Sequence, residues 1–302
     1  MIAARFLWAV LLAVFAGVGI AAADDPRPIV TDASAPLGKA EKSRLPTLYL
    51  VGDSTVRGGG SGKGIVGWGE RLAPYFDPDK INVVNDAIAG RSARTFFAEG
   101  RWARVTRSLK PGDFVMIQFG HNDQGRIGDP ANKHRADGRG IGPETAEDTL
   151  ADGTRVAVHT FGWYIARFAA DARARGATVI ICSPIPHKLR WQHGRDFSDI
   201  ARWDAEVAQK ENAIFVDLTL IITDAYKKLG MQKVETLFAD KNTHTTSQGA
   251  VLNAQCVVAG LKGLKNDPLA GFFSKKGEDV VPVDFKRLEP SASVTARAND
   301  KN

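Results

Sequence analysis

The chain has 302 residues, with 40 Lys and Arg against 34 Asp and Glu, a formal charge of +6, 44% hydrophobic residues and 2 Cys. These values exclude a collagen, a disulfide-stapled miniprotein and a wholly disordered chain. The length allows two domains or one α/β domain of about 250 residues. No basic run with interleaved aromatic residues indicates a nucleic-acid surface, so we expect no nucleic-acid partner.

The N-terminus has the layout of a cleavable leader. Arg5 precedes an apolar run at residues 6–20, which ends in three alanines, the last being Ala23, followed by acidic Asp24. This order predicts a secretory signal peptide over residues 1–23, cut after Ala23. The alternative is a membrane anchor, for which the run is short. We therefore expect a secreted or periplasmic monomer that has no membrane contact after cleavage.

Short apolar runs that each end at Gly, Pro, Asp or Asn follow a lead-in at residues 24–46 that lacks periodicity. They predict five strands, at residues 48–51, 81–84, 114–119, 179–182 and 214–216. Amphipathic patterns between them predict four helices, at residues 69–75, 161–175, 200–212 and 247–264. Apolar strands that alternate with amphipathic helices indicate a parallel sheet covered on both faces.

Two regions lack this alternation. Residues 124–158 are rich in Gly, Asp, Arg and Thr, and we expect a long loop that is functional or mobile. Residues 266–302 predict a polar C-terminal tail without a core pattern. The two cysteines, Cys182 and Cys256, lie in apolar runs, which favours two buried free thiols over a disulfide.

Polar motifs follow the first three predicted strands, and a fourth precedes the last helix. Ligands of open parallel sheets bind beyond the carboxyl ends of the strands. Ser54 in GDST is then a candidate nucleophile, with His244 as its base and Asp240 as the acid that orients the imidazole. The backbone N–H groups of Ser54 and Gly90 and the side-chain amide of Asn122 are candidate oxyanion donors. Each motif alone is also compatible with an ordinary turn, glycine bend or structural histidine.

Taken together, these motifs resemble the SGNH (GDSL-type) hydrolases and, within them, the rhamnogalacturonan acetylesterase-like branch. The matching runs are LVGDSTV, GWGERL, NDAIAGRSARTF, QFGHND, HTFGWY and THTTSQGA. The resemblance implies a flavodoxin-like three-layer α/β/α sandwich with a five-stranded parallel sheet, which we assign to residues 47–265. It also implies a serine esterase that removes O-acetyl groups from an acidic, pectic polysaccharide through an acyl-enzyme, with no metal and no cofactor.

One position departs from the family pattern. The family has Asp three residues before its catalytic His, whereas this chain has Lys241 there and Asp240 one residue earlier. A bulged loop could still bring Asp240 to the imidazole of His244. Asp217 and Glu235 are the alternative acids, and an enzyme closer to a dyad is the remaining possibility.

A basic edge at the carboxyl ends of the strands predicts how an acidic polymer binds. Arg91, Arg94 and Trp191 are the candidate substrate-binding residues, with Lys188 and Arg190 beside the tryptophan. Arginine suits carboxylates because its guanidinium binds them through two parallel hydrogen bonds. A solvated loop is the alternative interpretation for the residues around Trp191.

Other functions remain open on the same sequence. A lipase, thioesterase or arylesterase would favour longer or aromatic acyl groups, and a sugar O-acetyltransferase would exclude water in favour of a sugar acceptor. A carbohydrate-binding protein on an inactivated hydrolase fold is the alternative from another class. The presence of Ser54, Gly90, Asn122 and His244 together argues against it.

Overall fold

The computed structural model describes residues 40–58, 64–193 and 195–288. A five-stranded parallel sheet in the order β2-β1-β3-β6-β7 lies at its centre. Its strands are β1 (Thr47–Gly52), β2 (Asn82–Asn85), β3 (Phe114–Gln118), β6 (Thr178–Cys182) and β7 (Ile214–Val216). The five strands lie within a residue or two of their predicted positions, and the predicted parallel sheet is confirmed.

Strand side chains alternate between two separate cores, because successive residues of a strand face opposite sides of the sheet. In β1, Leu48 and Leu50 belong to one hydrophobic cluster, whereas Tyr49 and Val51 belong to the other. Both sets are buried, which explains why the strand is apolar throughout. The sheet therefore needs helices on both of its faces.

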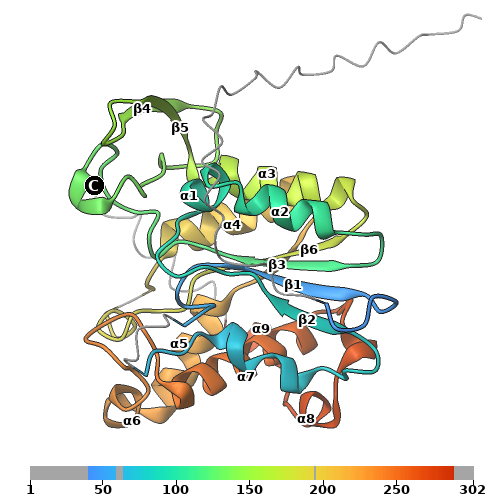
Figure 1. Cartoon of the computed structure of the whole chain (residues 1–302). Helices are drawn as coiled ribbons and strands as arrows, with labels where there is room; N and C mark the ends of the chain where they lie inside the picture. The colour runs from blue at the N-terminus through green and yellow to red at the C-terminus, as the bar shows by residue number, and fades with distance from the viewer. Residues whose placement is uncertain (1–39, 59–63, 194, 289–302) are drawn as a thin grey trace, which may run out of the picture.

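Helices cover both faces, as Figure 1 shows, and complete a three-layer α/β/α sandwich. The cluster with Tyr49 packs against α1 (Ala93–Ala98), α2 (Arg101–Ser108), α3 (Phe161–Ala174) and α4 (Ser198–Lys210). The opposite cluster packs against α5 (Leu218–Leu229), α6 (Met231–Glu235), α7 (Ser247–Lys262) and α9 (Phe285–Leu288). The predicted fold class is confirmed.

The helices differ from the prediction in two ways. The helix expected at residues 69–75 is two 3-10 turns, η1 (Trp68–Arg71) and η2 (Ala73–Tyr75), and Pro74 is the second residue of η2. The prediction also omits α1, α2, α5, α6 and α9, together with the short α8 (Lys275–Glu278). In α5 the run LTLIIT favours a strand by propensity, but Asp217 caps the helix and its apolar face packs on α7.

The segment predicted as a long loop at residues 124–158 contains an antiparallel hairpin and one 3-10 turn. Its strands are β4 (Thr145–Thr149) and β5 (Arg155–His159), and the turn is η3 (Pro130–Asn132). Figure 1 shows the hairpin beyond the sheet, on the α3 side. The prediction missed it because β4 reads TAEDT, which has no large apolar residue and no apolar alternation. Its buried Asp148, described below, fixes it to the body of the protein.

Residues 266–288, predicted as the start of a polar tail, instead pack on the domain. Leu269 and Phe273 are buried in the core, and the Phe273 ring lies 5.3 Å from that of Phe76. The short elements here are η4 (Ala270–Phe272), α8 (Lys275–Glu278) and α9. Isolated apolar residues without a period fill a gap in the core, so the boundary predicted at residue 265 is too early.

The predicted signal peptide at residues 1–23 and the last part of the predicted tail lie outside the described residues. Among the helices that are described, none has both the length and the apolar character needed to span a bilayer. Cys182 and Cys256 are buried free thiols, as the sequence favoured. Burial raises the pKa of both thiols, so neither is a nucleophile at neutral pH.

Candidate active site

The predicted site residues meet at the carboxyl edge of the sheet. Ser54 follows β1, Gly90 follows β2 and Asn122 follows β3, while His244 lies just before α7. The turn after β1 needs Gly52, because a Cβ there would lie 2.5 Å from the carbonyl oxygen of Gln118. This close approach of β1 and β3 presents Ser54 at the edge.

Ser54, His244 and Asp240 form one hydrogen-bonded chain. The Oγ atom of Ser54 lies 2.9 Å from Nε2 of His244, and Nδ1 of His244 is hydrogen-bonded to Oδ2 of Asp240. Since Nδ1 donates its proton to the carboxylate, Nε2 carries the lone pair and accepts from the serine hydroxyl. The imidazole is thereby oriented to take the proton of Ser54.

The loop before His244 folds around the carboxylate of Asp240 and absorbs the extra residue. Oδ1 of Asp240 accepts hydrogen bonds from the backbone N–H groups of Asn242, Thr243 and His244, at 2.9, 2.7 and 3.0 Å. Burial alone would raise the pKa of Asp240, but the bonds from the His244 side chain and these backbone groups outweigh it and hold the pKa well below its usual value. The carboxylate is therefore ionised at any working pH.

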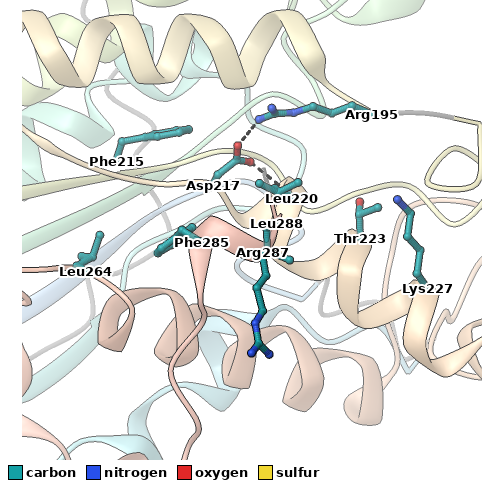
Figure 2. Close-up of a pocket in the computed structure, with 10 residues that line it drawn as sticks. All are labelled: Arg195, Phe215, Asp217, Leu220, Thr223, Lys227, Leu264, Phe285, Arg287 and Leu288. Atoms are coloured by element: carbon teal, nitrogen blue, oxygen red, sulfur yellow. Dashed lines mark hydrogen bonds and ion pairs between the residues drawn. The ribbon is translucent and has the colours of Figure 1, made fainter. Parts of the chain in front are cut away.

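The two alternative acids lie elsewhere. Asp217 caps α5 by accepting from the backbone N–H of Leu220, and it pairs with Arg195 at the wall of a hollow of about 720 Å³, as Figure 2 shows. Glu235 is exposed on α6. Neither contacts His244, so Asp240 is the carboxylate that the fold places on the imidazole.

The three predicted donor groups follow the carboxyl ends of β1, β2 and β3. Among the described residues, no acceptor takes the backbone N–H of Ser54 or that of Gly90. Gly90 has a φ of 76°, which a glycine adopts without strain. Nδ2 of Asn122 donates to the carbonyl of Arg91 at 3.1 Å. An amide nitrogen carries two hydrogens, so the second is left for a ligand.

A buried ion pair lies beneath the nucleophile. Nδ1 of His121 is 3.3 Å from Oδ2 of Asp53, and Nε2 is 3.1 Å from the carbonyl oxygen of Ile185. Both ring nitrogens face acceptors, so both carry protons and the ring is an imidazolium. Burial alone would lower the pKa of His121, but the Asp53 carboxylate and the Ile185 carbonyl outweigh it and raise the pKa. The pair fixes the Ser54 turn to the Asn122 loop.

Asp123 connects the two loops that carry Gly90 and Asn122. It accepts hydrogen bonds from the backbone N–H groups of Ala93 and Gly120, at 2.7 and 2.8 Å. Burial, with the charge of Asp53, raises the pKa of Asp123 to about 6. Burial and the neighbouring Asp123 raise the pKa of Asp137 well above its usual value.

The predicted substrate-binding residues are corrected by the structure. Arg94 is 5% exposed, pairs with the buried Asp148 at 2.6 Å and donates to the carbonyl of Ala136, so it holds the hairpin and cannot reach a polymer. Trp191 is 4% exposed and packs against Tyr226 in the core. Arg91 is half-buried, and its guanidinium is occupied by Glu99. The charges of Arg91 and Arg94 are thus paired within the fold, and Trp191 is a core residue.

A different basic hollow, of about 340 Å³, adjoins the site. It begins at Gln124, two residues after Asn122, and at His187, whose ring lies 5.2 Å from that of His121. The basic and acidic residues of its wall are Arg139, Arg190, Arg195, His187, His193, Asp196 and Asp199. Arg139 and Arg195 have carboxylate partners, whereas Arg190 has none among the described residues. Its exposed guanidinium is thus free to bind an anion.

No metal centre accompanies the site in the described part of the chain, where no group of three or more His, Cys, Asp or Glu side chains could hold an ion. The chemistry open to the arrangement is that of a hydroxyl nucleophile, its imidazole base and a cluster of N–H donors. A Ser–His–Asp chain at the carboxyl edge of a parallel α/β sheet is the arrangement of a serine hydrolase.

Comparison with known proteins places the chain within this class. Residues 50–252 match the GDSL-like lipase/acylhydrolase family, and the chain belongs to that family. It is 34% identical over 207 residues to the rhamnogalacturonan acetylesterase of Emericella nidulans, and the alignment covers 68% of this chain and 80% of the relative. It is 31% identical over 225 residues to the probable rhamnogalacturonan acetylesterase YesY of Bacillus subtilis, covering 72% and 93%.

The crystal structure of Bacillus subtilis YxiM has the same fold, with a TM-score of 0.58 and 24% identity, over 72% of this chain. The chain spans 56% of that structure, just over half. The family and fold predicted from the motifs are confirmed, and the protein is a carboxylic ester hydrolase.

Proposed function

We propose that this hydrolase removes O-acetyl groups from an acidic, pectic polysaccharide of the rhamnogalacturonan type. The observation that carries the proposal is the Ser54–His244–Asp240 chain beside the unpaired N–H groups of Ser54 and Gly90. The names of the two relatives described above support an acetyl ester of this polymer as the substrate.

In the proposed reaction, Oγ of Ser54 attacks the acetyl carbonyl carbon while Nε2 of His244 takes the serine proton. The negative charge that forms on the carbonyl oxygen is bound by the N–H groups of Ser54, Gly90 and Asn122. The sugar oxygen then leaves with the proton from His244, and the acetyl group stays on Ser54. Water, deprotonated by His244, attacks this ester, and Ser54 leaves with the proton, so acetate is released. Asp240 stabilises the imidazolium in both halves.

The basic hollow supports an acidic polymer. Arg190 lies in the segment that also supplies Lys188, whose Nζ donates to the carbonyl of Asp240 at 3.0 Å. A polysaccharide held at Ser54 would thus pass the free guanidinium of Arg190, which belongs to the same group of loops. A uronate carboxylate is a suitable partner for it.

Acetate release from a panel of substrates tests the proposal. We expect faster release from acetylated rhamnogalacturonan than from acetylated xylan, and faster hydrolysis of p-nitrophenyl acetate than of the octanoate. Faster octanoate hydrolysis would indicate a lipase, whereas transfer of acetyl to an added sugar in preference to water would indicate an O-acetyltransferase.

The role of the basic hollow in binding the polymer is tested by a separate experiment. Exposed charges are screened over about 8 Å at physiological ionic strength, so added salt should raise KM for the acidic polymer and leave p-nitrophenyl acetate unaffected. Arg190→Ala should raise KM for the polymer alone, and Lys265→Ala, at another exposed basic residue, is the matched control. Equal effects of both changes would remove the role of the hollow and leave the serine mechanism intact.

Export is part of the same proposal. Cleavage after Ala23 would deliver the mature enzyme to the extracellular polymer. Mass spectrometry of protein expressed with its leader should show a mature N-terminus at Asp24, and an uncut N-terminus would contradict this.

A further inference from the structure

Arg135, which no catalytic motif includes, contacts both loops of the oxyanion site. Its Nη1 donates to Oδ1 of Asn122 at 2.8 Å and lies 3.5 Å from the carbonyl oxygen of Gly90. The same guanidinium group therefore reaches the side chain of one proposed donor and the backbone of another. Its own Nε donates to the carbonyl of Asn132 at 3.0 Å, which fixes its direction.

The turn that presents Arg135 is held from several sides. Lys133 and His134 both have left-handed backbones, with φ of 52° and 54°, a conformation that non-glycine residues rarely adopt. The cost of this backbone conformation at His134 is offset by its side chain, whose Nδ1 lies 3.1 Å from the buried carboxylate of Asp148 in the hairpin. Arg94 binds that same carboxylate and the carbonyl of Ala136. The hairpin thus supports the residues on both sides of Arg135.

The contact with Arg135 decides which way the Asn122 amide faces. A guanidinium only donates hydrogen bonds, so the atom that faces it must be the amide oxygen. The amide nitrogen must then face the Arg91 carbonyl, with its second hydrogen left for the oxyanion. If the amide turned over, its oxygen would face the developing negative charge and repel it. A positive group on the amide oxygen also strengthens the N–H as a donor.

We propose that Arg135 is a positioning residue for the oxyanion site, which holds the Asn122 amide as a donor and stabilises the Gly90 loop. The proposal rests on the donor roles proposed above for Asn122 and Gly90. It is independent of which polysaccharide is the substrate, because it concerns only the acyl carbonyl.

Kinetics with p-nitrophenyl acetate test it without the polymer. Arg135→Met, which keeps the length of the stem, should lower kcat about 10- to 100-fold with KM changed less than about threefold, a part of the roughly 10²–10³-fold that a lost donor costs. Arg135→Lys keeps a charge and one donor, and should recover part of the loss. Arg126→Ala, at an exposed residue of the same segment, is the control and should leave kcat unchanged.

A double-mutant cycle distinguishes positioning from a general effect on the fold. In an Asn122→Ala background there is no amide to orient, so Arg135→Met should lower kcat less than about threefold further. A loss of folding would lower activity equally in both backgrounds, and Arg135→Lys serves in the cycle if the methionine variant is unstable.

Three outcomes would overturn the inference. One is the same fold-loss from Arg135→Met with and without Asn122. Another is a pure KM effect, which would make Arg135 a substrate-binding residue. The third is full activity of Asn122→Ala, which would show that Asn122 is not an oxyanion donor. In that case an inactive Ser54→Ala variant would still support the serine mechanism of the proposed function.

Discussion

The two halves of the active site are built in different ways. The half with Asp240 and His244 is local, since one loop of five residues wraps its own carboxylate with three backbone N–H groups. The oxyanion half collects Gly90, Asn122 and Arg135 from three separate segments. A local loop keeps its geometry through short-range bonds, whereas the oxyanion half depends on buried carboxylates and on the hairpin. Substitutions in the two halves should therefore have different effects on activity and stability.

The largest effect should come from the local half. Asp240→Asn removes the ionised acceptor of the His244 proton and should lower kcat by on the order of 10⁴-fold. The loop should keep its fold, because the amide oxygen can still accept backbone N–H groups. Glu235→Gln, at an exposed acid, is the control. A harmless Asp240→Asn would show that the enzyme works as a Ser–His dyad.

In the oxyanion half, Asn122→Ala should lower kcat about 10²- to 10³-fold with KM little changed. The reason is that the amide proton is required only when charge develops on the carbonyl oxygen. Steady-state kinetics on p-nitrophenyl acetate give both constants. A change confined to KM would place Asn122 in ground-state binding instead.

Arg94→Met should act on stability and leave polymer affinity unchanged. It removes one partner of a buried ion pair and leaves Asp148 with His134 alone, which costs on the order of 3 kcal/mol of unfolding free energy. Urea denaturation measures the loss. If the variant were as stable as the parent and its KM for the polymer rose, the original assignment of Arg94 to substrate binding would be restored.

The smallest effect concerns the carboxyl pair behind Asn122. The pKa of Asp123 is raised to about 6 in the folded protein. The folded state thus keeps a proton that the unfolded chain releases near pH 4, and stability falls as the pH rises from about 4 to 6. The pKa of Asp137 is raised even further above its usual value, so its own proton contributes to this loss of stability, and Asp137→Asn removes that contribution.

We therefore expect Asp137→Asn to lose less stability than the parent between pH 5 and pH 8, by about 1 kcal/mol. Denaturation in urea at the two pH values measures the difference. Glu206→Gln, at a surface residue paired with Arg202, should follow the parent. A variant that lost as much stability as the parent would show that the folded protein does not hold a proton on Asp137.

The sequence predicted the sheet and the local half of the site well, because both depend on short-range patterns. Apolar runs that end at Gly or Asp give the strands, and the motifs around Ser54 and His244 lie where strand and helix ends require them. The shifted spacing of Asp240 was the one local feature that departed from the family pattern. Its loop absorbs the extra residue by bonding backbone N–H groups to the Asp240 carboxylate.

The rest depended on contacts between distant segments. Arg94 and Arg135 are both basic residues near the oxyanion loops, and only the buried partner Asp148 and the amide oxygen of Asn122 distinguish their roles. Trp191 lacks any local sign of burial. Leu269 and Phe273 pack into the core from a segment with no period. Patterns of residue spacing along the sequence do not predict such contacts between distant segments.

Covalent labelling tests the central claim most directly. A fluorophosphonate should modify one residue, and peptide mass spectrometry after trypsin should place the adduct on Ser54 in the peptide LPTLYLVGDSTVR, with loss of esterase activity in proportion to labelling. Ser54→Ala should take up no label and show no turnover. An adduct on any other residue, or esterase activity that survives complete labelling of Ser54, would contradict the account.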